Sequence, residues 1–257
     1  MTPHPPPTLR SRVLQRVQAS HAHESQFMTV RHDAAAWTCV NGSMRSTALA
    51  RTDLARSSLV VLQAGCSLPV DPAFTQVELV VMGGQASAGH QALTCGDAAC
   101  LPNHRAHLVR AEGAGARLFL RLSTPGRPEG EYRSAKHGAC LMSAPDAPAT
   151  GLLHFSTVHG DDGWDDFCPG VRIKPLWHGG ERSSILVRMQ AGASVNAHRH
   201  PLEEECLMLA GEAFVGDTLL RSCDYQLAPM GSRHGAVTTD VGALFYVHGS
   251  LDPAAYL

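Results

Sequence analysis

Short apolar runs alternate with turn-forming residues along most of the chain. Typical runs are rich in Val, Leu and Phe, such as LVVL at 59–62, ELVVM at 78–82 and SILVRM at 184–189. Gly, Pro, Asp and Asn lie between the runs, as is typical of the turns that join strands in a sandwich or barrel. The pattern therefore predicts an all-β protein.

The strand pattern occurs twice, with a constant offset of 127 residues. RSSLVVLQAG at 56–65 returns as RSSILVRMQAG at 182–192, so that the final glycines lie 127 positions apart. A register kept without a gap over the following 40 or so positions indicates a duplicated unit, and we expect two tandem β domains. The matched pairs are Gly84 and Gly211, Asp97 and Asp224, Pro102 and Pro229, His107 and His234, and, upstream, Trp37 and Trp164.

Two segments lie outside the repeat. Residues 8–20 place four apolar side chains on one face at helical spacing, which predicts a short helix with Thr8 as its N-cap. We expect this helix to pack against the first barrel, with its arginines in solvent. Residues 123–151 are rich in Pro, Gly and Ala and favour a linker. The expected organisation is a tail and helix at 1–24, a barrel at 25–122, the linker, and a barrel at 152–257.

The stretch NAHRHPLEEECLMLAGE at 196–212 contains candidate metal ligands. Alternate residues of a strand share a face, so His198 and His200 can present two imidazoles to one centre. A turn after them would return the chain with a carboxylate beside the imidazoles. Strand alternation alone leaves open whether Glu204 or Glu205 faces the barrel interior.

The spacing around this stretch resembles the first motif of the cupin superfamily, G-x5-H-x-H-x3-E-x6-G. The matching residues are Gly192, His198, His200, Glu204 and Gly211. The second cupin motif is approximated by CDYQLAPMGSRHGAVT, where Pro229, Gly231 and His234 fit, while Cys223 replaces a glycine and Thr238 an asparagine.

This resemblance implies two double-stranded β-helix (jelly-roll) barrels, with a metal ion in the second. It assigns the ligands to His198, His200, Glu204 and His234. Three imidazoles and one carboxylate suit one divalent ion. Zinc is our first choice, and iron, manganese, nickel or copper would also be compatible. Cys206 shares the face of Glu204, and we interpret it as a side chain that fills the barrel rather than as a further ligand.

The first barrel lacks most of this ligand set. At the 127-residue offset, Asp71, Ala73 and Val77 replace the first three ligands, and only His107 matches His234. His104 and Glu78 are weak candidates for additional donors, and a structural site needs about four. We therefore expect the first barrel to be metal-free. The other H-x-H pair, His21 and His23, has no matching glycine, glutamate or strand and is interpreted as solvated.

A closer resemblance covers most of the chain. The segment GWDDFCPGVRIKPLWHGGERSSILVRMQAGASVNAHRHPLEEE is similar to the cupin domain of ChrR-type anti-sigma factors. The resemblance implies a regulatory cupin that senses a small molecule or an oxidant. The sigma-binding members of that family carry an H-x3-C-x2-C zinc domain, and this spacing does not occur here, so inhibition of a sigma factor through that module is not expected.

A metalloenzyme, for example a metal-dependent dioxygenase acting on a small organic substrate, is the alternative hypothesis. In such an enzyme the ligands would leave positions on the metal open for water, substrate or O₂. The residues nominated as acid or base groups near the metal are Glu205, Tyr225, Arg233 and Cys206. Each of them also has an ordinary interpretation as a surface or packing residue, so the catalytic residues stay unknown.

Composition limits the partners. The formal net charge is -2 and the pI about 6.7, which gives no electrostatic reason to expect nucleic acid or an anionic membrane. No apolar run resembles a signal peptide or membrane span, which favours a cytoplasmic protein. The eight cysteines form no Cys-x2-Cys pair. We expect a small-molecule ligand in the second barrel, whereas a protein partner and self-association stay open.

Overall fold

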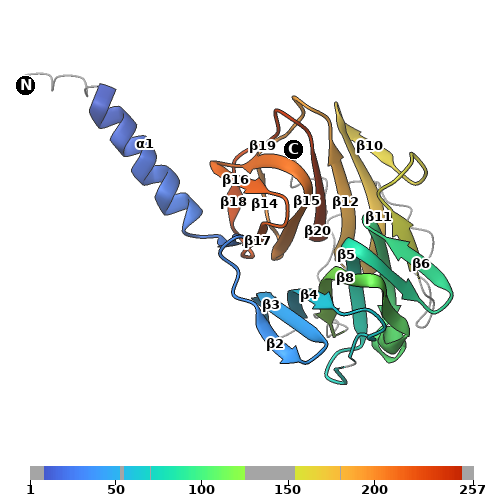
Figure 1. The fold of residues 1–257 in the computed structure, drawn as a ribbon. Coiled ribbons are helices and arrows are strands. Elements are labelled where there is room, and N and C mark those ends of the chain that lie inside the picture. Colours follow the sequence, from blue (N-terminus) through green and yellow to red (C-terminus); the bar gives the residue numbers. More distant parts are fainter. Residues whose placement is uncertain (1–8, 53–54, 70, 125–153, 180, 251–257) are drawn as a thin grey trace, which may run out of the picture.

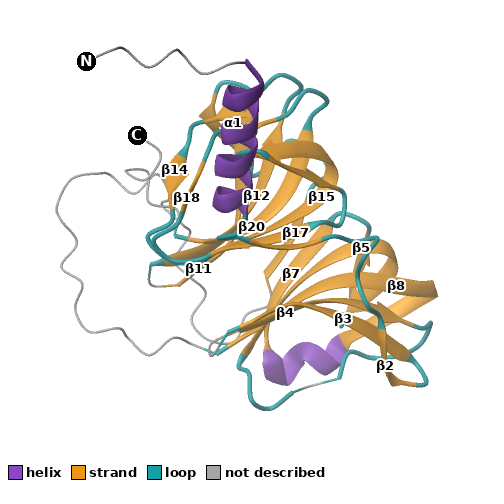
Figure 2. Ribbon diagram, turned by 90° about the vertical axis from the view of Figure 1, so that its left-hand side faces the viewer, coloured by secondary structure: helices purple, strands orange, loops and turns teal. Residues whose placement is uncertain are grey.

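The computed structural model describes residues 9–52, 55–69, 71–124, 154–179 and 181–250. These residues form two β barrels and one N-terminal helix (Figure 1), so the predicted all-β fold with a short helix is confirmed. Figure 2 shows the barrels one above the other, in contact along the faces of their sheets.

The first barrel is built on an antiparallel sheet in the order β2-β3-β4-β8-β5-β7-β9, with β6 paired to β5. The short 3₁₀ helix η1 (Asn103–Leu108) joins β7 to β8. Its own strands are β2 (Thr38–Asn41), β3 (Met44–Arg51), β4 (Ala55–Leu62), β5 (Gln76–Ala88), β6 (Gln91–Thr94), β7 (Asp97–Pro102) and β8 (Val109–Ser123).

The second barrel is built on the order β1-β17-β15-β20-β12-β11-β10, with β13, β16 and β19 attached and β14 and β18 paired separately. Its own strands are β10 (Asp165–Cys168), β11 (Val171–Gly179), β12 (Arg182–Met189), β13 (Ser194–Val195), β14 (His198–Arg199), β15 (Glu204–Val215), β16 (Thr218–Arg221), β17 (Tyr225–Ala228), β18 (Arg233–His234), β19 (Val237–Thr238) and β20 (Ala243–Gly249).

Matching backbone geometry accompanies the sequence repeat. Gly84 and Gly211 both have φ of 74°, in the left-handed region. A Cβ at either position would lie 2.1 Å from a carbonyl oxygen, that of Gly115 in one barrel and of Gly242 in the other. Only glycine fits both requirements, so this pair is conserved between the barrels for a steric reason.

Two strands cross between the barrels. β1 (Met28–Val30) precedes the first barrel in sequence but pairs with β17 of the second. β9 (His154–Thr157) precedes the second barrel but pairs with β7 of the first. The exchange is anchored by Arg31, whose Nη1 lies 3.0 Å from Asp224 Oδ2. Each sheet is therefore completed by a segment that lies next to the other barrel in sequence.

Apolar side chains from both barrels form one continuous core at their contact. Leu207, which alternation places on the face of β15 opposite Glu204, is fully buried there, and Leu209 packs against the same cluster. The first barrel therefore covers this face of β15. Other buried members of this cluster include Leu59, Val80, Phe119, Leu186, Tyr225 and Tyr246.

A buried ionic cluster lies within this apolar contact. Arg121 of β8 donates from Nε to Glu205 Oε1 at 2.8 Å, and its Nη1 lies 3.4 Å from Glu78 Oε1. All three side chains are about 4% exposed. Tyr225 and Tyr246 donate their hydroxyls to Glu205 and Glu78, at 2.8 and 2.9 Å. The cluster thus joins the barrels through ionisable groups that are almost completely buried.

The residues of this ionic cluster lie at positions that the 127-residue repeat relates to one another. Ser57, Glu78 and Arg121 lie side by side on three strands of the first barrel, as shown by the register of β4, β8 and β5. Their counterparts at the 127-residue offset are Ser184, Glu205 and His248, which have the same register in the second barrel. Burial, Arg121 and Arg182 lower the pKa of His248 well below its usual value. Arg121 is therefore the cation of the cluster.

The N-terminal helix α1 (Leu9–Glu24) occurs where it was predicted but does not pack as predicted. Val13, Leu14 and Val17 are 52%, 51% and 58% exposed, and Figure 1 shows the helix extending away from the barrels. The prediction that it packs on the first barrel is wrong, because β1 joins the second barrel immediately after the helix. Its arginines are exposed, as expected.

Several predictions concern residues outside the described ranges. Thr8, the predicted N-cap, is one of these residues, as is most of the predicted linker at 123–151. Within the described ranges, no helix is long and apolar enough to cross a bilayer.

Removal of the cluster's cation should destabilise the protein strongly. We expect Arg121→Ala to lower the free energy of unfolding by about 3–5 kcal/mol, because two buried carboxyl groups lose their charged partner. Urea unfolding followed by tryptophan fluorescence measures this change. The control is Arg105→Ala, an exposed arginine on η1, which should change the value by less than about 0.5 kcal/mol. Equal losses for the two variants would contradict the assigned role of Arg121.

Glu78 should make stability depend on pH. Burial raises the pKa of Glu78 above 4.5, although Arg121, Ser184 and Tyr246 act in the opposite direction. A carboxyl group with a raised folded pKa stabilises the protein below its unfolded pKa and loses that contribution as pH rises through the folded pKa. The advantage of wild type over Glu78→Gln should therefore decrease as the pH is raised above about 4.5.

Unfolding curves of the two proteins between pH 4 and 8 test this expectation. Glu212→Gln is the control, because the Glu212 side chain is 45% exposed. A difference between wild type and Glu78→Gln that stayed constant with pH would show that Glu78 does not titrate as inferred.

Candidate metal centre

The four predicted ligands come together at one end of the second barrel. His198 of β14 and His234 of β18 are direct partners across the antiparallel pair of strands. His200 is the residue that directly follows β14, and Glu204 is the first residue of β15. All four side chains are buried, with residue exposures of 2–8%. The H-x-H pair, the turn and the returning strand thus place their donors as the sequence predicted.

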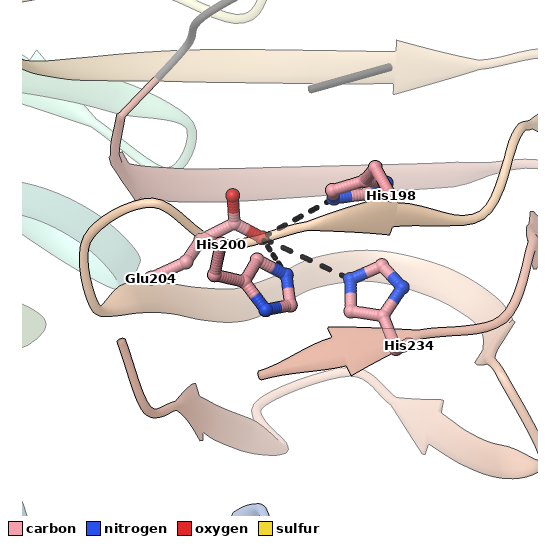
Figure 3. Close-up of side chains that lie close together, drawn as sticks. All are labelled: His198, His200, Glu204 and His234. Atoms are coloured by element: carbon pink, nitrogen blue, oxygen red, sulfur yellow. Dashed lines mark ion pairs between the residues drawn. The ribbon is translucent and has the colours of Figure 1, made fainter. Parts of the chain in front are cut away.

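The ligand atoms converge on the carboxylate of Glu204. Its Oε1 lies 3.9 Å from Nε2 of His198, 3.6 Å from Nε2 of His200 and 4.0 Å from Nε2 of His234 (Figure 3). One donor atom from each residue lies within 4.8 Å of all the others. Among the described residues, this is the one group of three or more His, Cys, Asp or Glu that could hold a metal ion.

Hydrogen bonds at the far side of each imidazole fix its orientation. Nδ1 of His198 lies 3.0 Å from the carbonyl oxygen of Asn196, and Nδ1 of His234 lies 2.8 Å from that of Gly235. Nδ1 of His200 lies 2.9 Å from Ser232 Oγ, which itself donates to the carbonyl of Pro229. These acceptors require the proton on Nδ1, which leaves the Nε2 lone pair for the centre.

The donor set fits a divalent metal ion. Two atoms each about 2.1 Å from one ion are about 3.0 Å apart at a right angle and about 4.2 Å apart in line, and the three distances to Glu204 fall between these limits. Nε2 of His200 is buried and has no hydrogen-bond partner in the protein. A bound ion would satisfy this atom, whose desolvation otherwise costs free energy.

The charges of the site also favour a cation. Burial by itself would raise the pKa of Glu204, but the proximity of the imidazoles of His198, His234 and His200 holds that pKa well below its usual range. Burial, together with the neighbouring imidazoles of His234 and His198, lowers the pKa of His200 to about 4, against the effect of Glu204. An ionised carboxylate and a neutral imidazole are the forms that bind metal.

A cavity of about 100 Å³ opens from the ligands into the barrel. His198, Glu204 and His234 line one part of it, together with Gln226 and Cys206, and valine, isoleucine, methionine and phenylalanine side chains line much of the rest. A molecule in this cavity would therefore meet the metal position directly.

Only one of the four nominated acid or base residues lines this cavity. Cys206 does so, but it is not part of the converging group, and burial and Glu204 both raise its thiol pKa. Glu205 and Tyr225 point to the other barrel and bond to each other there. Arg233 is exposed. The nominations of Glu205, Tyr225 and Arg233 are therefore wrong, because strand alternation and the turn direct these side chains away from the cavity.

The corresponding positions of the first barrel do not converge. Asp71 pairs with Arg56 at 3.1 Å, and His107 is exposed on η1. Val77, the counterpart of Glu204, is fully buried in the apolar core. The weak candidates are also placed elsewhere, since His104 is exposed and Glu78 faces the contact between barrels. That the first barrel holds no metal remains a prediction.

An aromatic residue missed by the sequence analysis lies over the ligands. Phe27 precedes β1, and its ring centroid is 6.4 Å from that of His200 and 6.2 Å from that of His234. Its other neighbour is His23 of α1, at 5.3 Å. His21 and His23 lie on a helix, in agreement with the expectation that this H-x-H pair is not part of a strand. His21 is exposed as expected, whereas His23 is partly buried. No local sequence signal connects Phe27 with a site some 170 residues away.

The comparisons with known proteins agree with this description. Residues 155–252 match the family model of the ChrR cupin-like domain. The match falls on the second barrel, which is the part of the chain whose sequence most resembles such cupins. Among curated proteins, no match to the chain is found.

Solved structures with the same fold extend over both barrels. A protein from Nostoc punctiforme, described as a "putative dioxygenase", has a TM-score of 0.63 and 16% identity over 90% of this chain and 86% of its own. YlbA from E. coli has a TM-score of 0.59 and 13% identity, with coverages of 87% and 90%. Oxalate decarboxylase from Lactobacillus farciminis has a TM-score of 0.57 and 12% identity, with coverages of 87% and 86%. At these identities the likeness establishes the tandem cupin fold.

Loss of the hydrogen bond behind His200 should weaken metal binding. We expect Ser232→Ala to raise the Kd for Zn²⁺ about 10- to 100-fold, because His200 Nδ1 loses the acceptor that orients the ring. Competition with a chromophoric chelator measures the Kd. The matched control is Ser222→Ala, an exposed serine that donates to the Leu209 carbonyl, and its Kd should equal that of wild type. An unchanged Kd in Ser232→Ala would remove the proposed role of Ser232.

Proposed function

We propose that this protein is a metal-binding bicupin with a regulatory or sensing role. Its second barrel would hold one mononuclear divalent metal ion, zinc as first choice, through His198, His200, Glu204 and His234. The observation that carries the proposal is the convergence of these buried donors at the end of an apolar cavity. A small molecule or an oxidant that enters the cavity would meet the metal.

Two further features support a sensing role. Phe27 packs against the rings of two ligands and belongs to the segment that joins α1 to β1. A change at the ligands would therefore act on the N-terminal segment, where a second protein could respond to it. The raised pKa of Cys206 makes its thiol a weak nucleophile at neutral pH, which favours the metal ion as the reactive centre.

A metalloenzyme that acts on a small organic substrate is the second candidate. The cavity touches His198, Glu204 and His234, so a metal ion there would have open positions on the cavity side for substrate or O₂. A cupin dioxygenase is one such enzyme. Uptake of O₂ by iron-loaded protein, dependent on a small carbonyl or thiol substrate, would favour this candidate over the sensor.

Metal analysis of protein purified without chelator tests the proposed site. We expect close to one equivalent of metal for the wild type and a loss of at least nine tenths of it in the double variant His198→Ala/His200→Ala, because two of four ligands are removed. The control is His104→Ala/His107→Ala, two exposed histidines of the first barrel, which should keep the full equivalent.

Equal metal content in the two double variants would contradict the assigned ligands. More than one equivalent in the wild type would contradict the prediction that the first barrel is metal-free.

A further inference from the structure

The cavity beside the metal position is apolar on most of its wall. Its volume of about 100 Å³ is somewhat smaller than that of an engineered cavity that binds benzene, about 150 Å³. Ile173 of β11, Val187 of β12 and Phe245 of β20 represent the apolar part of the wall. A second polar group on a ligand would be desolvated against these side chains without a partner, which costs free energy.

The polar groups of the cavity are gathered near Glu204. Gln226 is 3% exposed and lines the cavity. It shares a strand face with Ala228, and Ala228 is the direct partner of Glu204 between β17 and β15. Gln226 Nε2 donates to Thr29 Oγ1 at 3.2 Å, so the crossing strand β1 holds this amide in place. The cavity thus has one polar end and one apolar end.

We infer that the second barrel binds a small molecule with a single oxygen-donor head, such as a monocarboxylate, and a short apolar tail. The head would lie at the metal ion beside Gln226, and the tail would lie among Ile173, Val187 and Phe245. This inference rests on the proposed metal site and specifies the ligand class for it. The volume corresponds to a tail of about three to five carbon atoms.

Titration of the Co²⁺-loaded full-length protein with a series of carboxylates tests this ligand class. The visible absorption of the bound Co²⁺ reports binding of the head. From acetate through propionate and butyrate, Kd should fall about fourfold for each added methylene, the effect expected for complete burial of that group. Octanoate should bind more weakly than butyrate because its tail exceeds the cavity. Succinate, which places a second carboxylate in the apolar end, should bind at least tenfold more weakly than butyrate.

Variants at the apolar end separate tail recognition from head recognition. Val187→Ala enlarges the cavity and should move the optimum to a longer tail, with Co²⁺ content and the Kd of acetate unchanged. Val241→Ala is the control, since Val241 is 64% exposed, and its optimum should stay that of the wild type. Gln226→Leu should raise the Kd of every carboxylate by a similar factor, whatever the tail.

These measurements separate an error in the proposed metal site from an error in the inferred ligand class. If Co²⁺ does not bind, or binds equally to His198→Ala/His200→Ala, the metal site itself is wrong. If Co²⁺ binds at that site but the carboxylates do not, or if they bind without dependence on the tail, the ligand class is wrong and the metal site stands. Succinate binding as well as butyrate would also overturn the ligand class.

Discussion

The buried contact of Arg121 with Glu78 and Glu205 constrains both barrels. An ion cluster of this kind adds little net stability compared with apolar packing, but a misplaced partner leaves an uncompensated charge in a dry interface. It therefore selects one register for the strands that carry it. Because Glu205 must face Arg121, strand alternation turns its neighbour Glu204 into the barrel, toward the three histidines. The position of Glu204 is thus coupled to the contact between barrels.

The sequence was most informative where spacing and strand alternation act locally. The motif intervals selected Glu204 from three consecutive glutamates, and the constant offset revealed the duplication. Cys223 stands where the second cupin motif has a glycine. It has a φ of 71°, so it adopts the left-handed conformation typical of a glycine at this position. Long-range contacts were not predictable in this way. Which sheet edge is free decides where β1 and β9 pair, and it thereby decides the position of Phe27 and the exposure of α1. No local sequence pattern indicates which edge is free.

Comparison of the barrels shows how the same fold can hold a cavity or a filled core. Val77, Leu79 and Leu101 of the first barrel are at least 99% buried in its apolar cluster. Their counterparts at the 127-residue offset are Glu204, Cys206 and Ala228, which line the cavity of the second. Aliphatic side chains thus occupy the positions where the other barrel has a carboxylate, a thiol and a methyl group. The buried Glu at the barrel contact has been kept in both copies, whereas the ligand positions have diverged.

Because β1 and β9 cross reciprocally, each barrel depends on a segment next to the other barrel to complete its sheet. Thr29 and Gln226, in contact across β1 and β17, are 197 residues apart in the chain. During synthesis the second sheet can be completed only by β1, which is made before the whole first barrel, and such a distant pairing slows folding. Either barrel produced alone would expose an unpaired strand edge, which is a template for aggregation. Because of this exchange, neither barrel can be removed from the duplicated chain together with its adjacent strand without leaving an unpaired strand edge on the other barrel.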